Sequence, residues 1–435
     1  MSSHNLPSHW SSVKLGVVCE TTSGGTPSRK NPKYYTGKIP WIKSGELNYN
    51  IILDSEEKIT EEALENSNAK IFPKGTLLIA LYGATVGRLA FLGIDAATNQ
   101  AIAAIFTSSI LSNKFLYWYL YSYREKLLHQ RIGGAQPNIS QGTLRNIPIP
   151  LPPLHEQKKI VEKIEELFSE LDTGAASLKK AKEQIKLYRQ SVLAAAFSGR
   201  LTGKDDIFQK QNSKLKDVIF SGKAAEPQVE YNSQTLPDGW KWVKLENITS
   251  KLGDGLHGTP KYSDDGEYYF VNGNNLSDGK IEIKADTKKV NAEEFEKYKK
   301  TLNDSTVFVS INGTLGKTAF YNGEKIILGK SACYFNLKEN ISKQYIRYFI
   351  TSQRFINYAN KVATGSTIKN VSLKAMRELE IPLPPNEKIQ HRIVSEIEKR
   401  FSEADNLEKA IDESLQKSEA LRQSILKKAF EGRLI

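Results

Sequence analysis

Only two segments of the 435-residue sequence have the spacing of a nucleotide or phosphate site. Gly253–Gly258 fits the GxGxxG pattern, but a dinucleotide-binding turn must open a helix, and here Thr259, Pro260 and a polar loop follow. The run Gly316–Thr318 ends like a phosphate-binding loop, but Ile311 stands where such a loop requires its first glycine. We therefore expect tight turns at both places.

The sequence also lacks the side-chain patterns of a catalytic or metal site. Its six histidines show no HExxH or similar spacing, and two cysteines, Cys19 and Cys333, cannot supply a four-thiolate zinc site. A metal nuclease built on Asp238 is disfavoured because the repeat described below has Ser8 at the matching position. The Asp/Asn-Pro-Pro-aromatic segment of amino-methyltransferases is absent. We predict no catalytic, cofactor-binding or metal-binding residue in this chain.

Composition and charge bound the class of protein. With 39% hydrophobic and 25% charged residues the chain suits folded domains, two or three of them at about 150 residues each. No apolar run reaches the ~18–20 residues of a membrane span, and the N-terminus has no signal-like layout, so we expect a cytoplasmic protein with no membrane partner. The net charge of +12 fits either a nucleic-acid partner or a solvated basic surface, and charge alone gives affinity and not sequence preference.

The sequence contains an internal repeat: segments of its first half recur in its second half in the same order, with an offset of 229 to 233 residues. We interpret this as a duplicated pair of domains, because the period is far too long for a solenoid. The matching segments are Leu6-Pro7 with Trp10 and Leu236-Pro237 with Trp240; Gly25–Pro27 and Gly258–Pro260; Thr85–Phe91 and Thr314–Phe320; Asn138–Ser140 and Asn370–Ser372; Ile149–Pro153 and Ile381–Pro385; and Arg189–Leu201 and Arg422–Leu434.

Each repeat divides into a globular part and a helix. Short β-rich runs such as Thr76–Gly83 and Ser305–Gly313 lie among Gly, Asn and Pro residues, and a helical stretch is expected late in each globular part, around Asn113–Gln130 and Ser342–Lys361. The strap IPLPP then stops any preceding element, because proline lacks an amide proton and favours an extended residue before it.

Beyond each strap, the apolar spacing predicts a long helix. In the first repeat the apolar steps alternate between four and three with one weak position, Gly174, over about 40 residues, or roughly 60 Å. These residues form one narrow apolar stripe along the helix, which we call the seam. A seam of this kind is typical of a two-helix coiled coil. The second seam is less regular and shifts between Ile397 and Leu415. The predicted packing residues are Ile160, Ile164, Leu167, Leu171, Leu178, Ile185, Val192, Ile393, Ile397, Phe401, Leu407, Ile411, Leu415, Leu421 and Ile425.

Each seam needs a partner, and the most economical partner is the other helix. Homo-oligomerisation through these helices is the main alternative. The predicted helices are close to neutral, unlike the rest of the chain. Residues 155–200 hold nine basic and seven acidic residues, and residues 386–435 hold ten of each. The basic excess therefore lies mainly on the globular parts and the connector, so we expect those parts to meet nucleic acid.

The candidate nucleic-acid contacts are polar and basic residues in Gly-rich loops. Arg, Lys, Asn and Gln can make bidentate hydrogen bonds to base edges, while Ser, Thr and backbone amides fix phosphates. Loop composition is a weak signal, because ordinary turns use the same residues. The candidates are Thr26, Ser28, Arg29, Lys30, Lys33, Tyr34, Lys43, Ser44, Tyr82, Thr85, Arg88, Gln136 and Asn138 in the first repeat, and His257, Thr259, Lys261, Asn272, Asn274, Asn275, Asn312, Thr314, Lys317, Thr367, Lys369 and Asn370 in the second.

The whole arrangement resembles the specificity subunit of a type I restriction–modification system. The resemblance rests on the doubled order of globular domain, IPLPP strap and long helix ending in AFxGRL, together with the LPxxW opening and the GGTPS segment. It covers essentially the entire chain. It implies an α+β fold with two α/β target-recognition domains in a pseudo-two-fold repeat, joined by two long helices that form an antiparallel coiled coil.

The resemblance also implies a division of the chain and a set of partners. The expected parts are target-recognition domain 1 at 1–153, a spacer helix at 154–202, a linker at 203–235, target-recognition domain 2 at 236–385 and a second spacer helix at 386–435. The implied partners are double-stranded DNA, two modification subunits that bind S-adenosylmethionine and methylate adenine, and restriction subunits that use ATP and magnesium. The chain itself would be a non-catalytic subunit without a cofactor.

Two other classes of protein stay open at this point. The first is an adaptor with two interaction domains on a coiled-coil rod and no nucleic-acid partner, which the basic globular parts disfavour. The second is a DNA-modifying protein of another kind, either self-contained or the specificity part of a different modification system. The missing methyltransferase and nuclease motifs argue against a self-contained enzyme.

Overall fold

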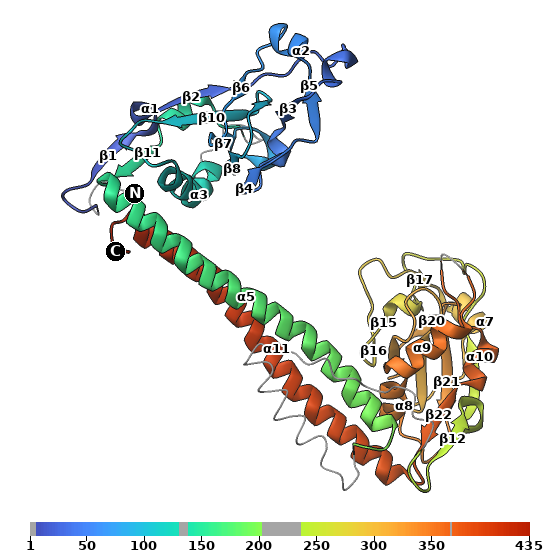
Figure 1. Cartoon of the computed structure of the whole chain (residues 1–435). Coiled ribbons are helices and arrows are strands. Elements are labelled where there is room, and N and C mark those ends of the chain that lie inside the picture. The colour runs from blue at the N-terminus through green and yellow to red at the C-terminus, as the bar shows by residue number, and fades with distance from the viewer. Residues whose placement is uncertain (1–5, 130–137, 202–235, 366–367) are drawn as a thin grey trace. The chain divides into compact units, whose positions relative to one another are not determined.

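The computed structural model describes residues 6–129, 138–201, 236–365 and 368–435. It contains two compact units, and neither is continuous in sequence. Unit 1 comprises residues 1–176 and 413–435, and unit 2 comprises residues 177–412. Each unit therefore combines one globular repeat with the beginning of the long helix that follows it and the end of the long helix from the other repeat (Figure 1).

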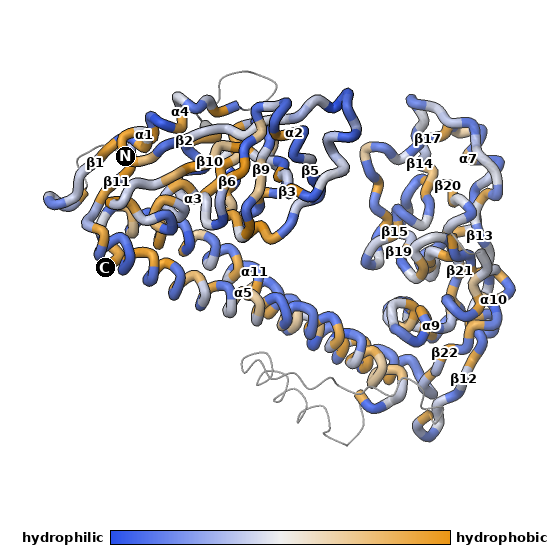
Figure 2. Tube along the Cα trace, turned by 45° about the horizontal axis from the view of Figure 1, so that its top comes forward, coloured by the Kyte–Doolittle hydropathy of each residue, from blue (hydrophilic) through white to orange (hydrophobic). Residues whose placement is uncertain are grey.

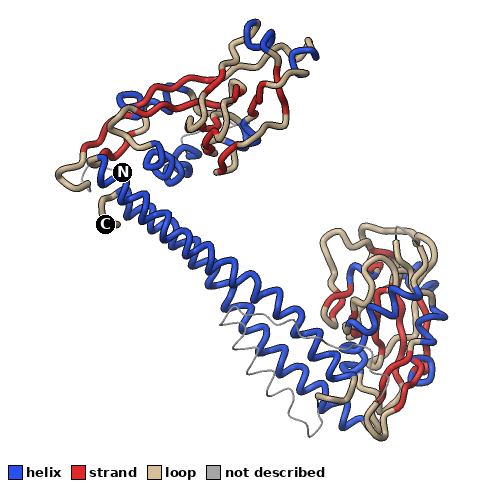
Figure 3. The backbone as a smooth tube through the Cα atoms, in the orientation of Figure 1, coloured by secondary structure: helices blue, strands red, loops and turns tan. Residues whose placement is uncertain are grey.

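Among the described residues of unit 1 the strands form three sheets, with helices around them (Figure 3). The five-stranded sheet has the order β2-β10-β7-β8-β4, the four-stranded sheet β5-β3-β9-β6, and β1 pairs with β11. The pairs β4–β8 and β3–β9 are parallel. The elements are β1 (Ser11–Lys14), α1 (Leu15–Val18), β2 (Cys19–Ser23), β3 (Ile39–Ile42), β4 (Asn50–Ile52), β5 (Glu57–Ile59), α2 (Glu61–Glu65), β6 (Ile71–Phe72), β7 (Leu77–Ala80), β8 (Leu89–Leu92), β9 (Ala96–Thr98), β10 (Ile102–Thr107), α3 (Asn113–His129), α4 (Gln141–Arg145) and β11 (Pro148–Leu151).

Unit 2 repeats this plan with local differences. Its sheets have the orders β13-β21-β18-β19, β17-β14-β20, β12-β22 and β15-β16, and β14–β20 is the parallel pair. The elements are β12 (Lys241–Lys244), β13 (Thr249–Asp254), β14 (Tyr268–Val271), β15 (Leu276–Ser277), β16 (Lys280–Ile281), β17 (Lys289–Val290), α7 (Ala292–Tyr298), β18 (Thr306–Ser310), β19 (Thr318–Phe320), β20 (Ile326–Leu328), β21 (Ala332–Leu337), α8 (Lys343–Ile350), α9 (Gln353–Val362), α10 (Leu373–Glu378) and β22 (Glu380–Leu383).

The predicted α+β repeat with two long helices is confirmed, and the helical stretch inside the second repeat needs a correction. One helix, α3, covers the first predicted stretch, but the second is divided into α8 and α9. The division falls at Ser352, whose hydroxyl accepts a hydrogen bond from the amide of Phe355 and caps the start of α9. The linker predicted at 203–235 lies outside the described residues.

The long helices are α5 (Leu154–Phe197) and α11 (Glu387–Phe430), and within each unit their segments run antiparallel. In unit 1, Arg422 of α11 pairs with Asp172 of α5; in unit 2, Lys182 of α5 pairs with Asp412 and Arg189 with Asp405. As the residue numbers rise along α5, those of the partners on α11 fall. Apolar stretches alternate with polar ones along both helices, as a seam requires (Figure 2).

The structure buries most of the predicted seam residues but corrects the second seam. Ile160, Ile164, Ile185, Val192, Ile393, Ile397, Ile411 and Ile425 are buried, and Leu167, Leu171, Leu178, Phe401, Leu407 and Leu415 are half-buried. Leu421 was predicted wrongly, because its side chain is 49% exposed. The predicted shift between Ile397 and Leu415 is also wrong. Steps of four and three continue without a break through buried or half-buried residues: Ile397, Phe401, Ala404, Glu408, Ile411, Leu415, Ser418, Arg422 and Ile425. Arg422 fits there because its guanidinium lies 4.8 Å from the Phe168 ring and pairs with Asp172.

The end of each long helix packs into the core of the opposite repeat. In unit 1, Phe430 lies edge-on to Phe115 and Tyr119 of α3, with ring centroids 5.3 and 5.2 Å away. In unit 2, Phe197 lies in the same way against two rings of α8, with both centroid distances 5.2 Å. The C-terminal end of the sequence therefore completes the core of the N-terminal domain.

The glycine of each AFxGRL motif makes this joint possible. Gly432 has φ +71 and Gly199 has φ +73, the left-handed conformation that ends a helix. A Cβ atom on Gly432 would lie 2.3 Å from Cγ of Pro7, and one on Gly199 would lie 2.0 Å from Cγ of Pro237. The LPxxW motif of each repeat thus sits directly on the AFxGRL motif of the other.

A buried glutamine ties each domain to the start of its own helix. The side-chain oxygen of Gln157 accepts a hydrogen bond from the backbone amide of Ser112, and its side-chain nitrogen donates to the carbonyls of Ile110 and Pro152. In unit 2, Gln390 accepts from the amide of Ser342 in the same way. Each strap becomes a strand, β11 or β22, that pairs with the segment after LPxxW. No helix among the described residues is long and apolar enough to cross a membrane.

Candidate nucleic-acid interface

Four loops of unit 1 emerge at one edge of its sheets, which we call the loop edge of unit 1. The loops are Gly24–Lys30, Lys43–Glu46, Leu81–Arg88 and Asn99–Ala101. Strand register brings them together, because the ends of β2 and β7 lie beside the start of β10, and β3 and β9 end side by side. The amide of Gly25 donates to the Thr98 carbonyl across 2.9 Å and joins the two sheets at this edge.

The equivalent loops of unit 2 form a second loop edge. The loops are Gly255–Lys261, Asn272–Asn275, Ile311–Lys317 and Gly329–Ser331. The ends of β13 and β18 lie beside the start of β21, and β14 and β20 end together. The amide of Leu256 donates to the Leu328 carbonyl across 2.7 Å. Both repeats therefore present loops at the same topological position.

One contact at the loop edge recurs in both units. In unit 1 an isolated antiparallel bridge joins Tyr82 to Asn138, and in unit 2 the matching bridge joins Asn312 to Asn370. The side-chain nitrogen of Asn312 also donates a hydrogen bond to the side-chain oxygen of Asn370, across 3.3 Å. Each bridge holds the loop after the central strand against the segment that leads into α4 or α10.

Most of the predicted DNA contacts lie on exposed or half-exposed parts of these loops or next to them. Thr26, Ser28, Arg29, Lys30, Lys33, Tyr82, Asn138, His257, Thr259, Lys261, Asn274, Thr314 and Lys369 are exposed, and Tyr34, Lys43, Ser44, Thr85, Arg88, Asn272, Asn312, Lys317 and Asn370 are half-buried. Gln136 and Thr367 lie outside the described residues. The structure thus brings the predicted side chains of each repeat to one loop edge or next to it.

Asn275 is the predicted contact that the structure contradicts. Its side chain is 5% exposed. The side-chain oxygen accepts a hydrogen bond from the amide of Asn272, and the side-chain nitrogen donates to the Glu282 carbonyl and to the Thr287 hydroxyl. A buried amide with these partners holds the loop in shape, so it is not available to a base edge.

Two of the predicted cations are already engaged within the protein. Arg29 pairs with Glu57 at 2.5 Å, and its guanidinium lies 4.1 Å from the Tyr35 ring. Lys43 pairs with Glu57 at 3.1 Å and with Glu56 at 2.8 Å. The hydrogen bond from Arg29 lowers the pKa of Glu57 and stabilises its carboxylate. The arginine fork is therefore held in one orientation at the loop edge, with half of its surface open to solvent.

Some polar residues of both loop edges are absent from the candidates predicted from the sequence. Gln100 accepts a hydrogen bond from the Thr26 hydroxyl, Glu57 orients Arg29, and the Ser331 hydroxyl donates to the Asn272 side chain. Gln100 follows the strand β9 in a polar Asn-Gln pair, a signal that could have been used. Glu57 lies far from Arg29 in sequence, so only the fold could show their contact.

Neither motif rejected as a cofactor site opens a helix, but only the second is the expected tight turn: Gly253–Gly258 is the end of β13 followed by a bend. Gly255 packs on backbone, where a Cβ would lie 2.1 Å from the Leu328 carbonyl oxygen, and no helix follows it. Gly316 has φ +81 and lies in the turn between β18 and β19. Both cysteines are buried, and burial raises the pKa of Cys19 to about 12. Among the described residues no group of three His, Cys, Asp or Glu side chains is placed to hold a metal ion.

Comparison with known families identifies the repeat. The sequence model of the family described as "Type I restriction modification DNA specificity domain" matches residues 7–185 and 237–417. The two matches cover most of both repeats.

Individual relatives give the same result. The EcoDI specificity subunit of a type I restriction enzyme from Escherichia coli is 25% identical, over 100% of this chain and 90% of that protein. The EcoKI specificity subunit from Escherichia coli strain K12 is 26% identical, over 100% and 91%. Among solved structures, the HsdS subunit from Thermoanaerobacter tengcongensis has a TM-score of 0.59 at 20% identity, with 100% of this chain and 99% of that chain covered. A chain from a structure of a type I R-M system has a TM-score of 0.70 at 20% identity, over 99% and 100%.

Proposed function

We propose a function from family membership: this chain belongs to the type I restriction–modification DNA specificity family, and its two loop edges read two different DNA half-sites. The chain is the specificity subunit of such a system, as its full-length relatives are. The observation that carries the proposal is the pair of loop edges. They occupy the same topological position in the two repeats but are built from different residues, as TTSGGTPSRK and LGDGLHGTPK illustrate.

The charges of the two edges support a DNA partner. Exposed cations stand beside hydroxyls and amides, the combination that fixes phosphates and reads base edges. In unit 1 these include Arg29, Lys30 and Lys33, and in unit 2 Lys261 and Lys369. Both terminal nitrogens of Arg29 bond Glu57 and the guanidinium lies over Tyr35, so its exposed side can meet a phosphate with little further loss of side-chain entropy.

The partners and chemistry follow from the same proposal. Methyl transfer and cleavage would belong to modification subunits with S-adenosylmethionine and to restriction subunits with ATP and magnesium. The sequence and the described residues offer no methyltransferase or metal motif that would perform either step. The pure chain should therefore give no methyl transfer from S-adenosylmethionine, and measurable turnover would contradict the non-catalytic assignment.

The test is selection of DNA by the chain assembled with its modification subunits. Binding to a random duplex pool should weaken steeply with salt, and the selected sequences should share two separated elements. Replacing residues 1–150 by the matching domain of a relative should change one element and leave the other. A change in both elements would refute the assignment of one half-site to each repeat. A chain that selects no sequence at all would favour the adaptor alternative.

A further inference from the structure

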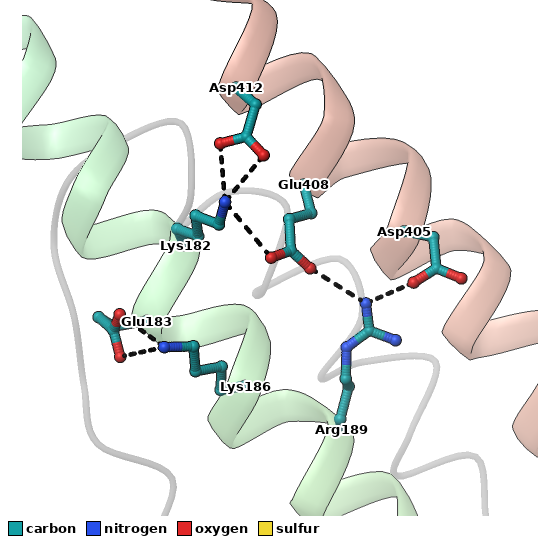
Figure 4. Close-up of polar contacts among 7 residues, drawn as sticks. All are labelled: Lys182, Glu183, Lys186, Arg189, Asp405, Glu408 and Asp412. Carbon is teal, nitrogen blue, oxygen red and sulfur yellow. Dashed lines mark hydrogen bonds and ion pairs between the residues drawn. The ribbon is translucent and has the colours of Figure 1, made fainter. Parts of the chain in front are cut away.

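In unit 2 an ion network connects α5 to α11 (Figure 4). Nζ of Lys182 lies 2.7 and 2.8 Å from the two carboxylate oxygens of Asp412, and 3.5 Å from Glu408. Nη2 of Arg189 lies 2.6 Å from Asp405 and 3.3 Å from the other oxygen of Glu408. The hydrogen bond to Asp412 raises the pKa of Lys182. Glu408 thus receives one cation from each side.

One part of this network is symmetric between the repeats. The repeat offset of 233 residues relates Arg189 to Arg422 and Asp172 to Asp405. Accordingly, Arg189 pairs with Asp405 in unit 2, and Arg422 pairs with Asp172 in unit 1. At matching positions, an arginine of each helix pairs with an aspartate of the other helix, so this Arg–Asp pair would form equally well between two copies of the same helix. It therefore fixes the antiparallel register without distinguishing one helix from the other.

The remaining part is asymmetric. The same offset places Leu415 at the position that matches Lys182, and Lys179 at the position that matches Asp412. Glu408 matches Ala175. The second repeat therefore has no equivalent of the Lys182–Asp412 pair.

This asymmetry has a consequence for pairing between identical helices. If α5 paired with a second copy of α5 in the observed register, Lys182 would face Lys179 of the copy. If α11 paired with a second α11, Glu408 would face Glu419. In the α11–α11 pair Glu408 would keep an arginine partner, Arg422, but it would lose its lysine partner, because Leu415 matches Lys182. Either like pairing would therefore bring like charges together, which destabilises it.

We propose that the network around Lys182 and Asp412 selects the unlike helix as the coiled-coil partner and disfavours pairing with the same helix of a second copy. The symmetric Arg–Asp pairs stabilise all pairings alike, so the choice requires an asymmetric contact. Charged residues flanking a seam commonly set partner choice in coiled coils. Resting on the proposed function, the consequence is that two different recognition domains stay together, and the target is asymmetric.

The test uses the full chain with a reporter cysteine in place of the exposed Lys180. In an α5–α5 pair of this register, positions 180 and 181 lie opposite each other, so an oxidant should link two copies. The native cysteines are buried and stay outside the reaction. The chain carrying only Lys180→Cys should remain monomeric. Adding Lys182→Glu places a third acid beside Asp412 and Glu408 in the native pair, whereas in the like pair it faces the attractive Lys179. It should therefore raise the yield of disulfide-linked dimer by roughly twofold to fivefold.

The compensating change distinguishes partner choice from general damage. Lys182→Glu combined with Asp412→Lys restores an opposite-charge pair in the native arrangement and should return the dimer to the parent level. Lys159→Glu, an equal charge change on an exposed position of α5 outside the network, is the matched control and should have no effect. If Lys182→Glu leaves the dimer yield unchanged, or Asp412→Lys fails to reverse its effect, the proposal is refuted. Since the readout contains no DNA, either result is independent of whether the loop edges bind DNA.

Discussion

Phe430 provides a direct test of the joint between the end of α11 and the N-terminal domain. Its ring is fully buried and lies edge-on to Phe115 and Tyr119, residues more than 300 positions away in sequence. Truncating a buried phenylalanine costs about 3–5 kcal/mol, which includes the transfer of its apolar surface, the cavity that remains and the lost ring contacts. A typical domain has a total stability of about 5–15 kcal/mol. Phe430→Ala should therefore remove a large part of the stability of unit 1.

The assay is urea unfolding followed by hydrogen exchange on peptides of each unit. Phe430→Ala should speed exchange in α3 and in the β1–β11 pair and leave the sheets of unit 2 protected. Phe197→Ala should do the reverse, because that ring packs on Tyr345 and Phe349. Leu421→Ala is the matched control on the same helix, and its exposed side chain should cost less than about 0.5 kcal/mol. If Phe430→Ala behaves like this control, the helix end does not complete the core of unit 1.

Three further predictions concern the anchors and the loop edge. Gln157→Leu should destabilise unit 1 by about 2–4 kcal/mol in urea titrations, because the Ser112 amide and two carbonyls lose their buried partner, whereas Lys159→Gln should be neutral. Gly25→Ala should weaken selection of one DNA element by roughly tenfold or more, because its Cβ would lie 2.2 Å from the Asn68 carbonyl carbon; Gly174→Ala, on α5 outside the loop edge and with open space around it, should leave binding unchanged. The Arg29–Glu57 pair should add stability that is fully present above the ordinary Glu pKa of 4.5 and is lost as the pH falls through the lowered folded value, so Glu57→Gln should flatten the acid limb of the stability profile of unit 1.

The sequence predicted the architecture because its signals there are redundant. The repeat, the straps and the heptad spacing all indicate the same arrangement, and the structure confirms an α+β fold with long helices at Leu154–Phe197 and Glu387–Phe430. The prediction failed where a polar residue occupies an apolar position. Arg422 lies in the second seam with its guanidinium on Phe168, so a search for apolar residues selected the exposed Leu421 in its place.

The loop edges could be predicted only as loops. Residue type identified Asn275 as a DNA contact, but the fold surrounds its amide with backbone and hydroxyl partners. Residue type also identified Arg29, but its orientation depends on Glu57, which β5 brings beside it. Whether a polar side chain faces solvent or satisfies a buried group depends on strand register, and residue composition contains no information on that register.

The packing explains why some segments are alike in the two repeats and others differ. Pro7 contacts Gly432, and Pro237 contacts Gly199, so each joint takes one motif from each repeat. The two joints have the same geometry, and each motif must therefore fit a partner that belongs to the other half. The loop edges have no such constraint, because their hydrogen bonds close within one unit, as between Gly25 and Thr98 or Leu256 and Leu328. Residues of one loop edge can therefore change without disturbing either joint. The two half-sites are independent because the contacts that join the repeats lie away from the loop edges.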